Sequence, residues 1–387
     1  MKILVLTSSS GGGHDMRARS LKQWAEHPAC ADLGVTVEIH QALEGTGGLY
    51  AFGSEVYNWI QKHWPALHHV YFNLLEWIPF CSGSSIPRAG EFQKFIRERD
   101  PDVILSTHDH LNHAYMKVAR DAYAPGERRP LTGTYCGELF GGYGFSRHWV
   151  NPEGDFFIAA VDPCLEEARR LKMPADKSWT GGFLLNPDFW SEPTATAERE
   201  RLMREEFGLT PGRFTLILAT GANGANNHLA TLRQFAAAGV HPQIIALCGN
   251  NARAKADIEA WARAHPQIPV CALPYQSRMK RVMECADAIF ARPGTGTTSE
   301  AILAGIPILF NGIGGVMPQE CITVKFARTR FETRVVRRPG QLPGIIGEWI
   351  QNPGKVAAAK AGAALARPDG HPRLILERLC LLAQARP

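Results

Sequence analysis

Short apolar runs alternate with amphipathic stretches along the whole chain. In the first half, predicted strands and helices alternate over 2–7, 15–25, 35–39, 92–99 and 103–106. In the second half, they alternate over 214–219, 243–248, 252–264 and 288–291. Short apolar strands separated by helices are typical of parallel βαβ units. The pattern therefore predicts an α/β fold with two doubly wound domains that face each other across a cleft.

The segment 189–205 is rich in Pro, Ser, Thr and charged residues, which is typical of a linker. We therefore predict a first domain over 1–188 and a second domain over 206–370. Residues 371–387 are expected to form a C-terminal helix that packs back toward the first domain. In doubly wound sheets ligands bind beyond the carboxyl ends of the strands, so the site is expected in the cleft.

Residues 50–80 contain nine aromatic residues, although a chain-wide aromatic fraction of 9% predicts about three. Two interpretations stay open. The segment can be a helix pair buried against the sheet, since large aromatic side chains are core residues first. It can also be an exposed apolar surface that contacts a membrane or holds a lipid chain, with Trp59 and Trp64 as contact residues.

Composition narrows the functional classes. The net charge of +5 over 387 residues is too small to indicate nucleic-acid binding, but it suits a phosphorylated ligand or an anionic membrane surface. The nine scattered cysteines form no CxxC pair, which favours a reducing compartment over a disulfide framework. No run approaches the ~20 apolar residues that cross a bilayer. We therefore expect a cytoplasmic protein that binds the inner face of the cell membrane peripherally.

A glycine-rich turn, Gly11-Gly12-Gly13-His14, follows the first predicted strand. Glycines allow the backbone to approach a ligand closely, and His14 falls at a helix N-terminus facing the cleft. The turn does not match the dinucleotide fingerprint GxGxxG, because Met16 stands at its last position. Gly12, Gly13 and His14 are therefore candidates for a ligand site in the cleft, with a solvent-exposed capping residue as the alternative for His14.

The segment 291–310 carries the clearest chemical signal. A strand ends at Ala291, a turn rich in Gly and Thr follows, and a helix is expected to begin near Thr297. Backbone N–H groups and the positive end of a helix dipole suit a diphosphate. Glu300, expected in the first helical turn, can accept hydrogen bonds from both hydroxyls of a ribose. The alternative is that Glu300 only complements the helix dipole.

Residues 291–320 resemble the donor-site signature of the diacylglycerol glycosyltransferases, which are the monogalactosyldiacylglycerol synthases and the bacterial diacylglycerol glucosyltransferases. The resemblance extends to Gly11–His14, 102–108, 148–162 and 180–187. It implies the GT-B fold, with two Rossmann-like domains. It also implies inverting transfer of glucose or galactose from a UDP-sugar to a lipid hydroxyl, most directly that of diacylglycerol.

The resemblance places the UDP-sugar in the second domain. The implied donor-binding residues are Gly221, Ala222, Asn223, Gly224, Tyr275, Gly294, Thr295, Gly296, Thr297, Thr298, Glu300, Gln319 and Glu320. The two glycine-rich segments would hold the diphosphate, Glu300 the ribose and Tyr275 the uracil. Gln319 and Glu320 would bind the sugar hydroxyls. The resemblance implies no cofactor and no metal ion.

On the acceptor side, the resemblance implies that His14 and Glu138 act on the acceptor, with Trp149 close to the acceptor or the membrane. The family usually has Asp where this chain has Glu138. A basic or small residue usually follows the family's loop histidine, where this chain has Asp15. Either Glu138 or His14 can serve as the general base that deprotonates the acceptor hydroxyl.

A competing signal lies at His108-Asp109-His110-Leu-Asn112-His113, which nearly spells a metallo-hydrolase motif. Three histidines at this spacing can bind zinc, but Asn112 stands where that motif needs Asp. We therefore expect no metal site, and zinc on His108, His110 and His113 stays the alternative.

Two other functions also stay open. One is a UDP-sugar epimerase or hydrolase on the same fold, and the other is a UDP-sugar-binding protein without activity. No signal in the sequence indicates a nucleic-acid or an obligate protein partner.

Overall fold

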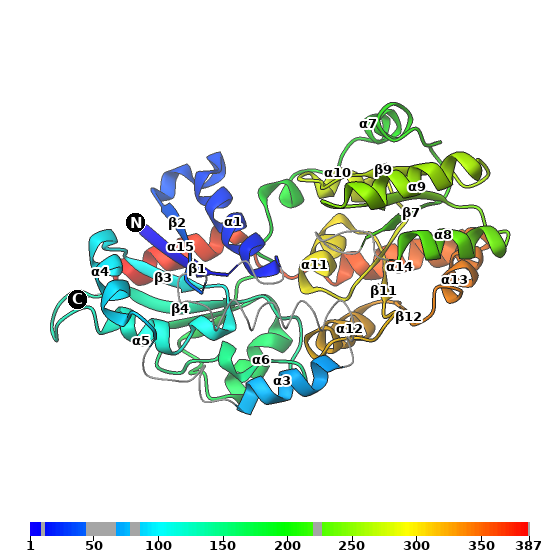
Figure 1. Ribbon diagram of the computed structural model, residues 1–387. Coiled ribbons are helices and arrows are strands. Elements are labelled where there is room, and N and C mark those ends of the chain that lie inside the picture. Colours follow the sequence, from blue (N-terminus) through cyan, green and yellow to red (C-terminus); the bar gives the residue numbers. More distant parts are fainter. Residues whose placement is uncertain (9–11, 44–66, 78–85, 220–226, 386–387) are drawn as a thin grey trace. The chain divides into compact units, whose positions relative to one another are not determined.

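The computed structural model describes the chain except residues 9–11, 44–66, 78–85, 220–226 and 386–387 (Figure 1). Contacts divide the chain into two compact units. The N-terminal unit comprises Met1–Pro187, Met317–Ile322 and Pro368–Pro387, and the C-terminal unit comprises Asp188–Val316 and Thr323–Arg367.

The described residues of the N-terminal unit form a parallel sheet with strand order β2-β1-β3-β4-β5-β6. Its strands are β1 (Lys2–Thr7), β2 (Thr36–Gln41), β3 (Val103–Ser106), β4 (Leu131–Cys136), β5 (Phe156–Ala159) and β6 (Ser178–Thr180). Its helices are α1 (Gly13–Glu26), η1 (Pro28–Leu33), α3 (His68–Trp77), α4 (Ala89–Arg99), η5 (Asp109–Leu111), α5 (Ala114–Arg120), η6 (Arg147–Trp149), α6 (Asp162–Arg170) and α15 (Pro372–Gln384). The strand order changes direction between β1 and β3, which is the topological switch point of this sheet.

The C-terminal unit contains a second parallel sheet, with strand order β12-β11-β10-β7-β8-β9 among the described residues. Its strands are β7 (Thr215–Leu218), β8 (Gln243–Leu247), β9 (Val270–Leu273), β10 (Ala288–Ala291), β11 (Ile308–Asn311) and β12 (Val335–Val336). Its helices are α7 (Thr196–Arg201), η8 (Leu202–Glu206), α8 (His228–Ala237), α9 (Ala252–Ala264), α10 (Met279–Glu284), α11 (Thr295–Ala304), α13 (Gln341–Gln351) and α14 (Pro353–Leu365). This is the Rossmann order, with the switch point between β7 and β10. The helices η7 (Pro187–Trp190) and α12 (Pro318–Arg330) span the division between the units.

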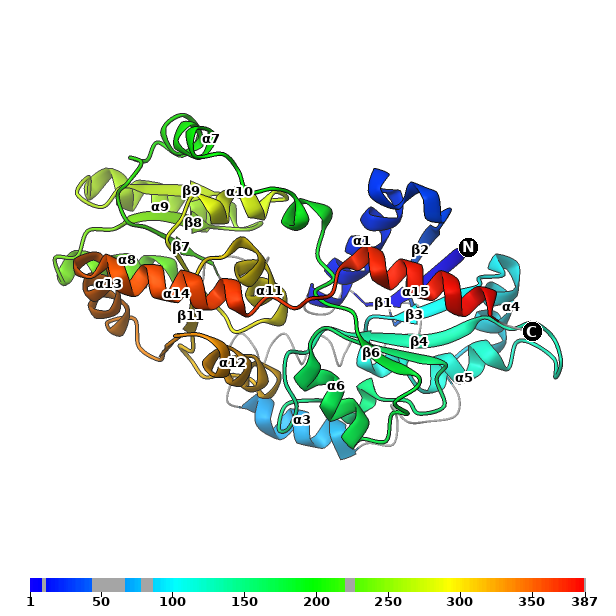
Figure 2. The ribbon, with the colours of Figure 1, turned by 180° about the vertical axis from the view of Figure 1, so that it is seen from behind.

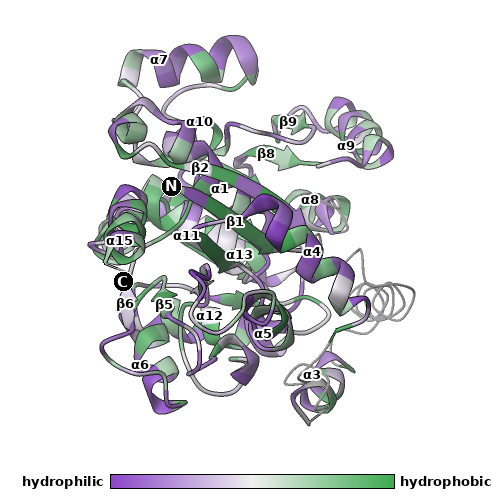
Figure 3. Cartoon of the chain, turned by 90° about the vertical axis from the view of Figure 1, so that its left-hand side faces the viewer, coloured by the Kyte–Doolittle hydropathy of each residue, from purple (hydrophilic) through white to green (hydrophobic). Residues whose placement is uncertain are grey.

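The central strands of both sheets are buried on both faces. The side chains of 3–6 in β1 and 244–246 in β8 are at most 1% exposed, and both strands are hydrophobic in Figure 3. Burial on both faces explains why these strands appear in the sequence as continuous apolar runs rather than as alternating ones. The prediction of two doubly wound domains is confirmed. The two units are described separately, so the cleft expected between them stays a prediction.

Residues 189–205, expected to be a linker, carry α7 and are hydrogen-bonded to α10 of the C-terminal unit. The Nζ of Lys280 donates to the carbonyl of Glu192 over 2.7 Å. Lys280 also pairs with Glu284 over 3.0 Å, and both side chains are only 8% exposed. The carboxylate of Glu284 in turn accepts from the N–H and the hydroxyl of Thr194. This segment is therefore a packed part of the C-terminal unit.

The C-terminal helix α15 packs against α1 and η1 within the N-terminal unit (Figures 1 and 2). Arg373 forms a bidentate ion pair with Asp32, with distances of 2.8 and 2.7 Å. The ring of His371 lies 4.8 Å from that of Trp24. A Cβ at Gly370 would lie 2.4 Å from the backbone of Gly181, so the chain approaches this unit as closely as glycine allows.

Candidate functional site

His14 lies at the switch point of the N-terminal sheet, in the first turn of α1. The turn before it passes through Gly12, whose φ of 72° lies in the left-handed region that glycine adopts without strain. Helix α1 then begins at Gly13, directly after the end of β1. Gly11, the first glycine of the motif, lies outside the described residues.

A hydrogen bond fixes the tautomer of His14. Its Nδ1 lies 2.7 Å from the carbonyl oxygen of Thr107, which follows β3. Because a carbonyl only accepts hydrogen bonds, Nδ1 carries the proton and Nε2 keeps its lone pair. Burial, with smaller effects of His108 and Arg17, lowers the pKa of His14 to about 3. The imidazole is therefore neutral near pH 7, with Nε2 as a proton acceptor.

Glu138 follows β4 and is 9% exposed. Its Oε2 has no hydrogen-bond partner among the described residues. Burial raises the pKa of Glu138 to about 7, while Arg17 acts in the opposite direction and Asp109 in the same direction. Arg17 donates to the carbonyl of Gly137 over 3.0 Å, and a Cβ at Gly137 would overlap its guanidinium. The glycine before Glu138 is therefore required for Arg17 to fit.

Trp149 is 2% exposed, and its ring centroid lies 5.8 Å from that of His14. Its side chain therefore belongs to the surroundings of His14, and it offers no exposed surface to a membrane. Trp59 and Trp64, the other two tryptophans assigned to this role, lie outside the described residues.

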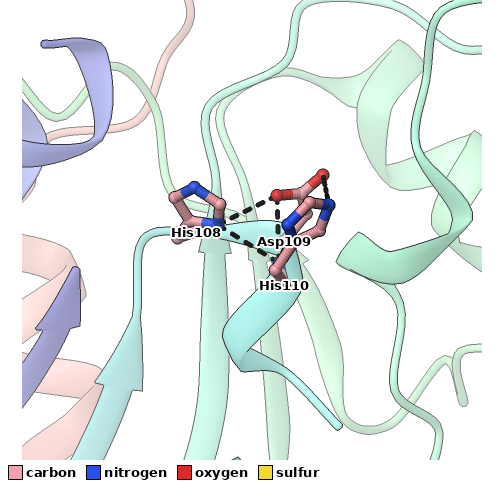
Figure 4. A group of neighbouring side chains, drawn as sticks. All are labelled: His108, Asp109 and His110. Atoms are coloured by element: carbon pink, nitrogen blue, oxygen red, sulfur yellow. Dashed lines mark hydrogen bonds and ion pairs between the residues drawn. The ribbon is translucent and has the colours of Figure 1, made fainter. Parts of the chain in front are cut away.

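His108, Asp109 and His110 follow β3 and place the carboxylate between two imidazoles (Figure 4). Nδ1 of His108 lies 3.0 Å from Oδ1 of Asp109, and Nε2 of His110 lies 3.8 Å from Oδ2. The ring of His113 instead lies 6.1 Å from that of His148. The structure therefore groups Asp109, and not His113, with His108 and His110, which makes the zinc set suggested by the sequence wrong in its third member.

Asn112, which departs from the metallo-hydrolase motif, has a structural role. Its amide donates to the carbonyls of His148 and Trp149 over 3.1 and 3.2 Å, and its oxygen accepts from Thr134 over 2.7 Å. Asn112 therefore holds the segment of η6 that carries Trp149 next to His14.

In the C-terminal unit, α11 begins at the switch point after β10. Gly294 is its N-cap residue and no side chain caps the first turn, so its N–H groups suit an anionic ligand. The hydroxyl of Thr298 is buried and has no partner among the described residues. The helix begins at Thr295, two residues before the predicted start at Thr297, so Glu300 lies in the second turn and not in the first. Burial raises the pKa of Glu300 to about 7.

The remaining predicted donor residues lie on neighbouring loops. Arg292 donates to the carbonyl of Gly315 over 2.8 Å, which ties the turn after β10 to the loop after β11. Tyr275 follows β9 and is 58% exposed. Residues Gly221–Gly224 of the other glycine-rich turn lie outside the described residues.

Gln319 and Glu320 lie in the first turn of α12. Glu320 is 3% exposed, and its Oε2 accepts from the N–H of Met317 over 2.8 Å. One carboxylate oxygen of Glu320 thus stabilises the start of its own helix. Contacts group 317–322 with the N-terminal unit, whereas the sequence placed them in the second domain.

Solved structures show the class of this fold. The chain aligns over its full length with MurG of Acinetobacter baumannii, at a TM-score of 0.60, 13% identity and 99% coverage of that chain. It also aligns over its full length with Anabaena HepE in complex with UDP-glucose, at a TM-score of 0.57, 15% identity and full coverage. A UDP-GlcNAc 2-epimerase from Neisseria meningitidis bound to UDP-GlcNAc matches 99% of this chain and all of its own, at a TM-score of 0.56 and 13% identity. The fold is GT-B.

Sequence comparison assigns the enzyme class. Residues 215–310 match the glycosyltransferase family 28 C-terminal domain. A probable chloroplastic monogalactosyldiacylglycerol synthase of Nicotiana tabacum is 23% identical over 384 residues, which cover 95% of this chain and 68% of that protein. Arabidopsis thaliana monogalactosyldiacylglycerol synthase 1 is 22% identical, over 90% of this chain and 64% of that protein. A processive diacylglycerol beta-glucosyltransferase of Bacillus licheniformis is 22% identical, over 87% and 83%. The resemblance expected from the sequence is confirmed, and the chain is a glycosyltransferase.

Sequence reasoning missed four residues of the N-terminal site: Thr107, Arg17, Asp109 and His148. Each reaches the site through tertiary structure, from the end of β3, from one turn further along α1, or from η6. The quoted motifs contained Thr107, Asp109 and His148, but no pattern in the sequence indicated which side chains they contact.

Proposed function

We propose that this protein transfers a hexose from a UDP-sugar to a lipid hydroxyl, with inversion at the anomeric carbon and with diacylglycerol as acceptor. The named activities of the plant and bacterial relatives support the substrate class. The observation that carries the proposal is the tautomer of His14, whose Nδ1–H is held by the carbonyl of Thr107. An unprotonated Nε2 at the switch point of a sheet can act as the general base that takes the proton from an acceptor hydroxyl.

The proton moves in the transfer step itself. The acceptor oxygen bonds to the anomeric carbon from the face opposite to UDP, the bond between that carbon and the UDP oxygen breaks, and UDP leaves with the electron pair. The hydroxyl proton passes to Nε2 of His14. A weakly basic imidazole can accept it because the hydroxyl becomes strongly acidic as its oxygen bonds to carbon. The negative charge of Asp109 favours the imidazolium that forms.

Glu138 is the second candidate base. Its unpartnered Oε2 is buried in the same unit, and with a pKa of about 7 a large fraction of it is ionised at neutral pH. A carboxylate whose pKa lies near the working pH is well matched to general-base catalysis. We place His14 first because its hydrogen bond already fixes which atom accepts the proton.

On the donor side, we propose that the uncapped start of α11 binds the diphosphate and that Glu300 binds the ribose. The positive end of a helix stabilises the charge that develops on the leaving UDP. This stabilisation comes from backbone groups, so the proposed transfer uses no metal ion.

We further propose that α3 contacts the membrane. Val70 and Leu74 lie one turn apart on this helix and are 65% and 56% exposed, and Leu67 just before it is 37% exposed. Tyr143, 52% exposed, donates or accepts a 2.7 Å hydrogen bond with His69 of the same helix. We call Leu67, Val70, Leu74 and Tyr143 the α3 patch. Exposed apolar side chains beside a tyrosine are typical of interfacial binding. No helix within the described part of the chain is both long and apolar enough to cross a bilayer.

The test is UDP release from UDP-glucose and from UDP-galactose, measured with and without vesicles that contain diacylglycerol. We expect release that depends on the lipid, with a glycolipid as product. His14→Asn is the matched control, and we expect it to bind UDP without turnover. Lipid-independent loss of the UDP-sugar would indicate an epimerase or hydrolase instead, and tight UDP binding without any turnover would indicate a binding protein.

A further inference from the structure

Five of the 14 histidines of the chain gather in the N-terminal unit, at the carboxyl ends of its strands. They are His14, His108, His110, His113 and His148, which we call the histidine cluster. Neighbouring ring centroids lie between 4.3 and 6.1 Å apart. The proposed transfer uses His14 alone, so the other four imidazoles have no role in it. Imidazole nitrogen is a preferred ligand of zinc and neighbouring transition metals.

Within the cluster, three consecutive residues offer a compact donor set. One nitrogen of His108, one oxygen of Asp109 and one nitrogen of His110 all lie within 4.8 Å of one another (Figure 4). Two ligands bound at 2.0–2.1 Å to a tetrahedral ion lie roughly 3.3 Å apart. The 3.0 Å from Nδ1 of His108 to Oδ1 of Asp109 and the 3.8 Å from Nε2 of His110 to Oδ2 of Asp109 bracket this separation. Each imidazole nitrogen therefore lies near the ligand spacing from one oxygen of the carboxylate.

His108 and Asp109 form a close contact at this place. Nδ1 of His108 lies 3.0 Å from Oδ1 of Asp109. The backbone N–H of His110 donates to the same Oδ1 over 2.9 Å and lies 3.2 Å from Nδ1 of His108. An imidazole nitrogen and a carboxylate oxygen at this distance share either a proton or a metal ion, because two acceptors with nothing between them would repel each other.

His148 provides an independent observation. Its side chain is 2% exposed, and its Nε2 has no hydrogen-bond partner among the described residues. Leaving a buried polar atom unpaired costs about 1–3 kcal/mol, so such atoms usually have a ligand or a water molecule. The ring of His148 lies 6.1 Å from that of His110, which places an imidazole with an unpartnered nitrogen beside one of the three donor residues.

We propose that His108, Asp109 and His110 form a binding site for one divalent transition metal ion of the Zn²⁺ type, with His148 as an additional donor. Two or three imidazoles and one carboxylate match the nitrogen and oxygen donors that zinc takes. Mg²⁺ and Ca²⁺ prefer sets made of oxygen and do not suit this site. The site is separate from the proposed diphosphate site in the C-terminal unit, and it holds whether or not the protein transfers sugar to lipid.

The test uses the full chain, stripped of metal by a chelator and titrated with Co²⁺, whose visible absorption reports tetrahedral nitrogen and oxygen ligands. We expect one Co²⁺ per chain, displaced by one equivalent of Zn²⁺. His110→Asn and Asp109→Asn should each weaken binding tenfold or more. His113→Asn is the matched control, because this histidine is close in sequence but outside the donor set, and it should bind as the wild type does.

Three results would overturn the proposal. The first is that the wild type binds no Co²⁺ with a tetrahedral spectrum. The second is that His110→Asn and Asp109→Asn bind it unchanged. The third is that His113→Asn alone loses it, which would restore the set suggested by the sequence. Thermal melting of each variant in chelator establishes folding independently of the ion. His110, 24% exposed, is the ligand whose replacement perturbs the core least.

Discussion

At the scale of single residues, burial shifts the pKa values of the two proposed bases, His14 and Glu138, in opposite directions. Burial disfavours the charged form of each, so it lowers the pKa of His14 to about 3 and raises that of Glu138 to about 7. Groups with such divergent values in one site are typical of acid–base chemistry. Their titrations fall at very different pH values, so the two proposed bases can be separated by experiment.

The pH dependence of kcat/KM distinguishes the bases. If His14 accepts the proton, the rate should stay nearly constant from pH 8 down to about pH 5, because this imidazole is still neutral there. If Glu138 accepts it, kcat/KM should fall tenfold for each pH unit below about pH 7, because this carboxylate becomes protonated there. We expect the first profile.

We also expect His14→Asn to lose 10²-fold or more of turnover, a typical loss for a general base. If kcat/KM of the wild type falls below about pH 7 and this fall is absent in Glu138→Gln, Glu138 and not His14 is the general base.

Glu138 should also make stability depend on pH. Its pKa is raised from 4.5 to about 7 in the folded protein, so the folded state holds the proton more tightly than the unfolded chain. The resulting stabilisation is complete below pH 4.5 and is lost as the pH rises through 7. The shift corresponds to roughly 3 kcal/mol. We therefore expect Glu138→Gln to gain about that much stability relative to the wild type between pH 4.5 and pH 8, measured by denaturant unfolding.

The exposed Glu127 provides the control for this measurement. Its hydrogen bond to Arg97 lowers its pKa below the ordinary value of 4.5, so Glu127 is ionised in both the folded and the unfolded protein well above that pH. The stability difference between Glu127→Gln and the wild type should therefore stay constant from about pH 6 to pH 8, where that of Glu138→Gln still changes. A constant difference for Glu138→Gln as well would mean that Glu138 is solvated in solution.

At the scale of elements, α11 is the helix proposed to bind UDP, with its N-terminus at the diphosphate and Glu300 at the ribose. Glu300→Ala should weaken UDP binding by about 1.5–3 kcal/mol, the range for hydrogen bonds to a charged group. Calorimetry with UDP measures this directly. Glu332→Ala, an exposed carboxylate on the same unit, is the control and should bind UDP normally. Unchanged affinity in Glu300→Ala would remove this residue from the ribose site.

The α3 patch is the element that tests membrane binding. Replacing Val70 and Leu74 by Ser removes two exposed apolar contacts, and we expect the double variant to bind anionic vesicles ten-fold or more weakly in a sedimentation assay. The matched control replaces Leu374 and Leu381 of α15, which are 53% and 65% exposed. Both variants should melt as the wild type does, because none of the four side chains is in the core. Equal vesicle binding by the two double variants would contradict the proposal.

Much of the fold could be predicted because its signal is local. Three elements occur at their predicted residues: the strands 103–106 and 288–291 and the helix 252–264. Continuous apolar runs and amphipathic periodicity depend only on neighbouring positions, so the sequence alone indicates such elements. The predicted start of α11 was two residues off, because its N-cap residue Gly294 has no capping side chain that marks the start of the helix in the sequence. The partners of His14 could not be predicted, because Thr107 reaches it from 93 residues away through strand pairing.

At the scale of the whole molecule, metal removal separates the two sites. The proposed transfer stabilises the leaving UDP with backbone groups at the start of α11, and its base His14 is favoured by the negative charge of Asp109, which a bound ion would neutralise. Protein stripped with EDTA should therefore keep its rate of glycolipid synthesis, measured as lipid-dependent UDP release. Loss of activity that Zn²⁺ restores would show that the ion takes part in transfer.

The position of α15 also affects how the protein is synthesised. The C-terminal unit lies entirely within residues 188–367, so it can fold as soon as that stretch has left the ribosome. The N-terminal unit appears first but is completed last, because its α1 and η1 wait for α15 to supply His371 and Arg373. During translation, the side of α1 at Trp24 that α15 later covers therefore stays exposed while the second unit is synthesised. A ribosome stalled before α15 has emerged would expose this surface to chaperones while the C-terminal unit is already formed.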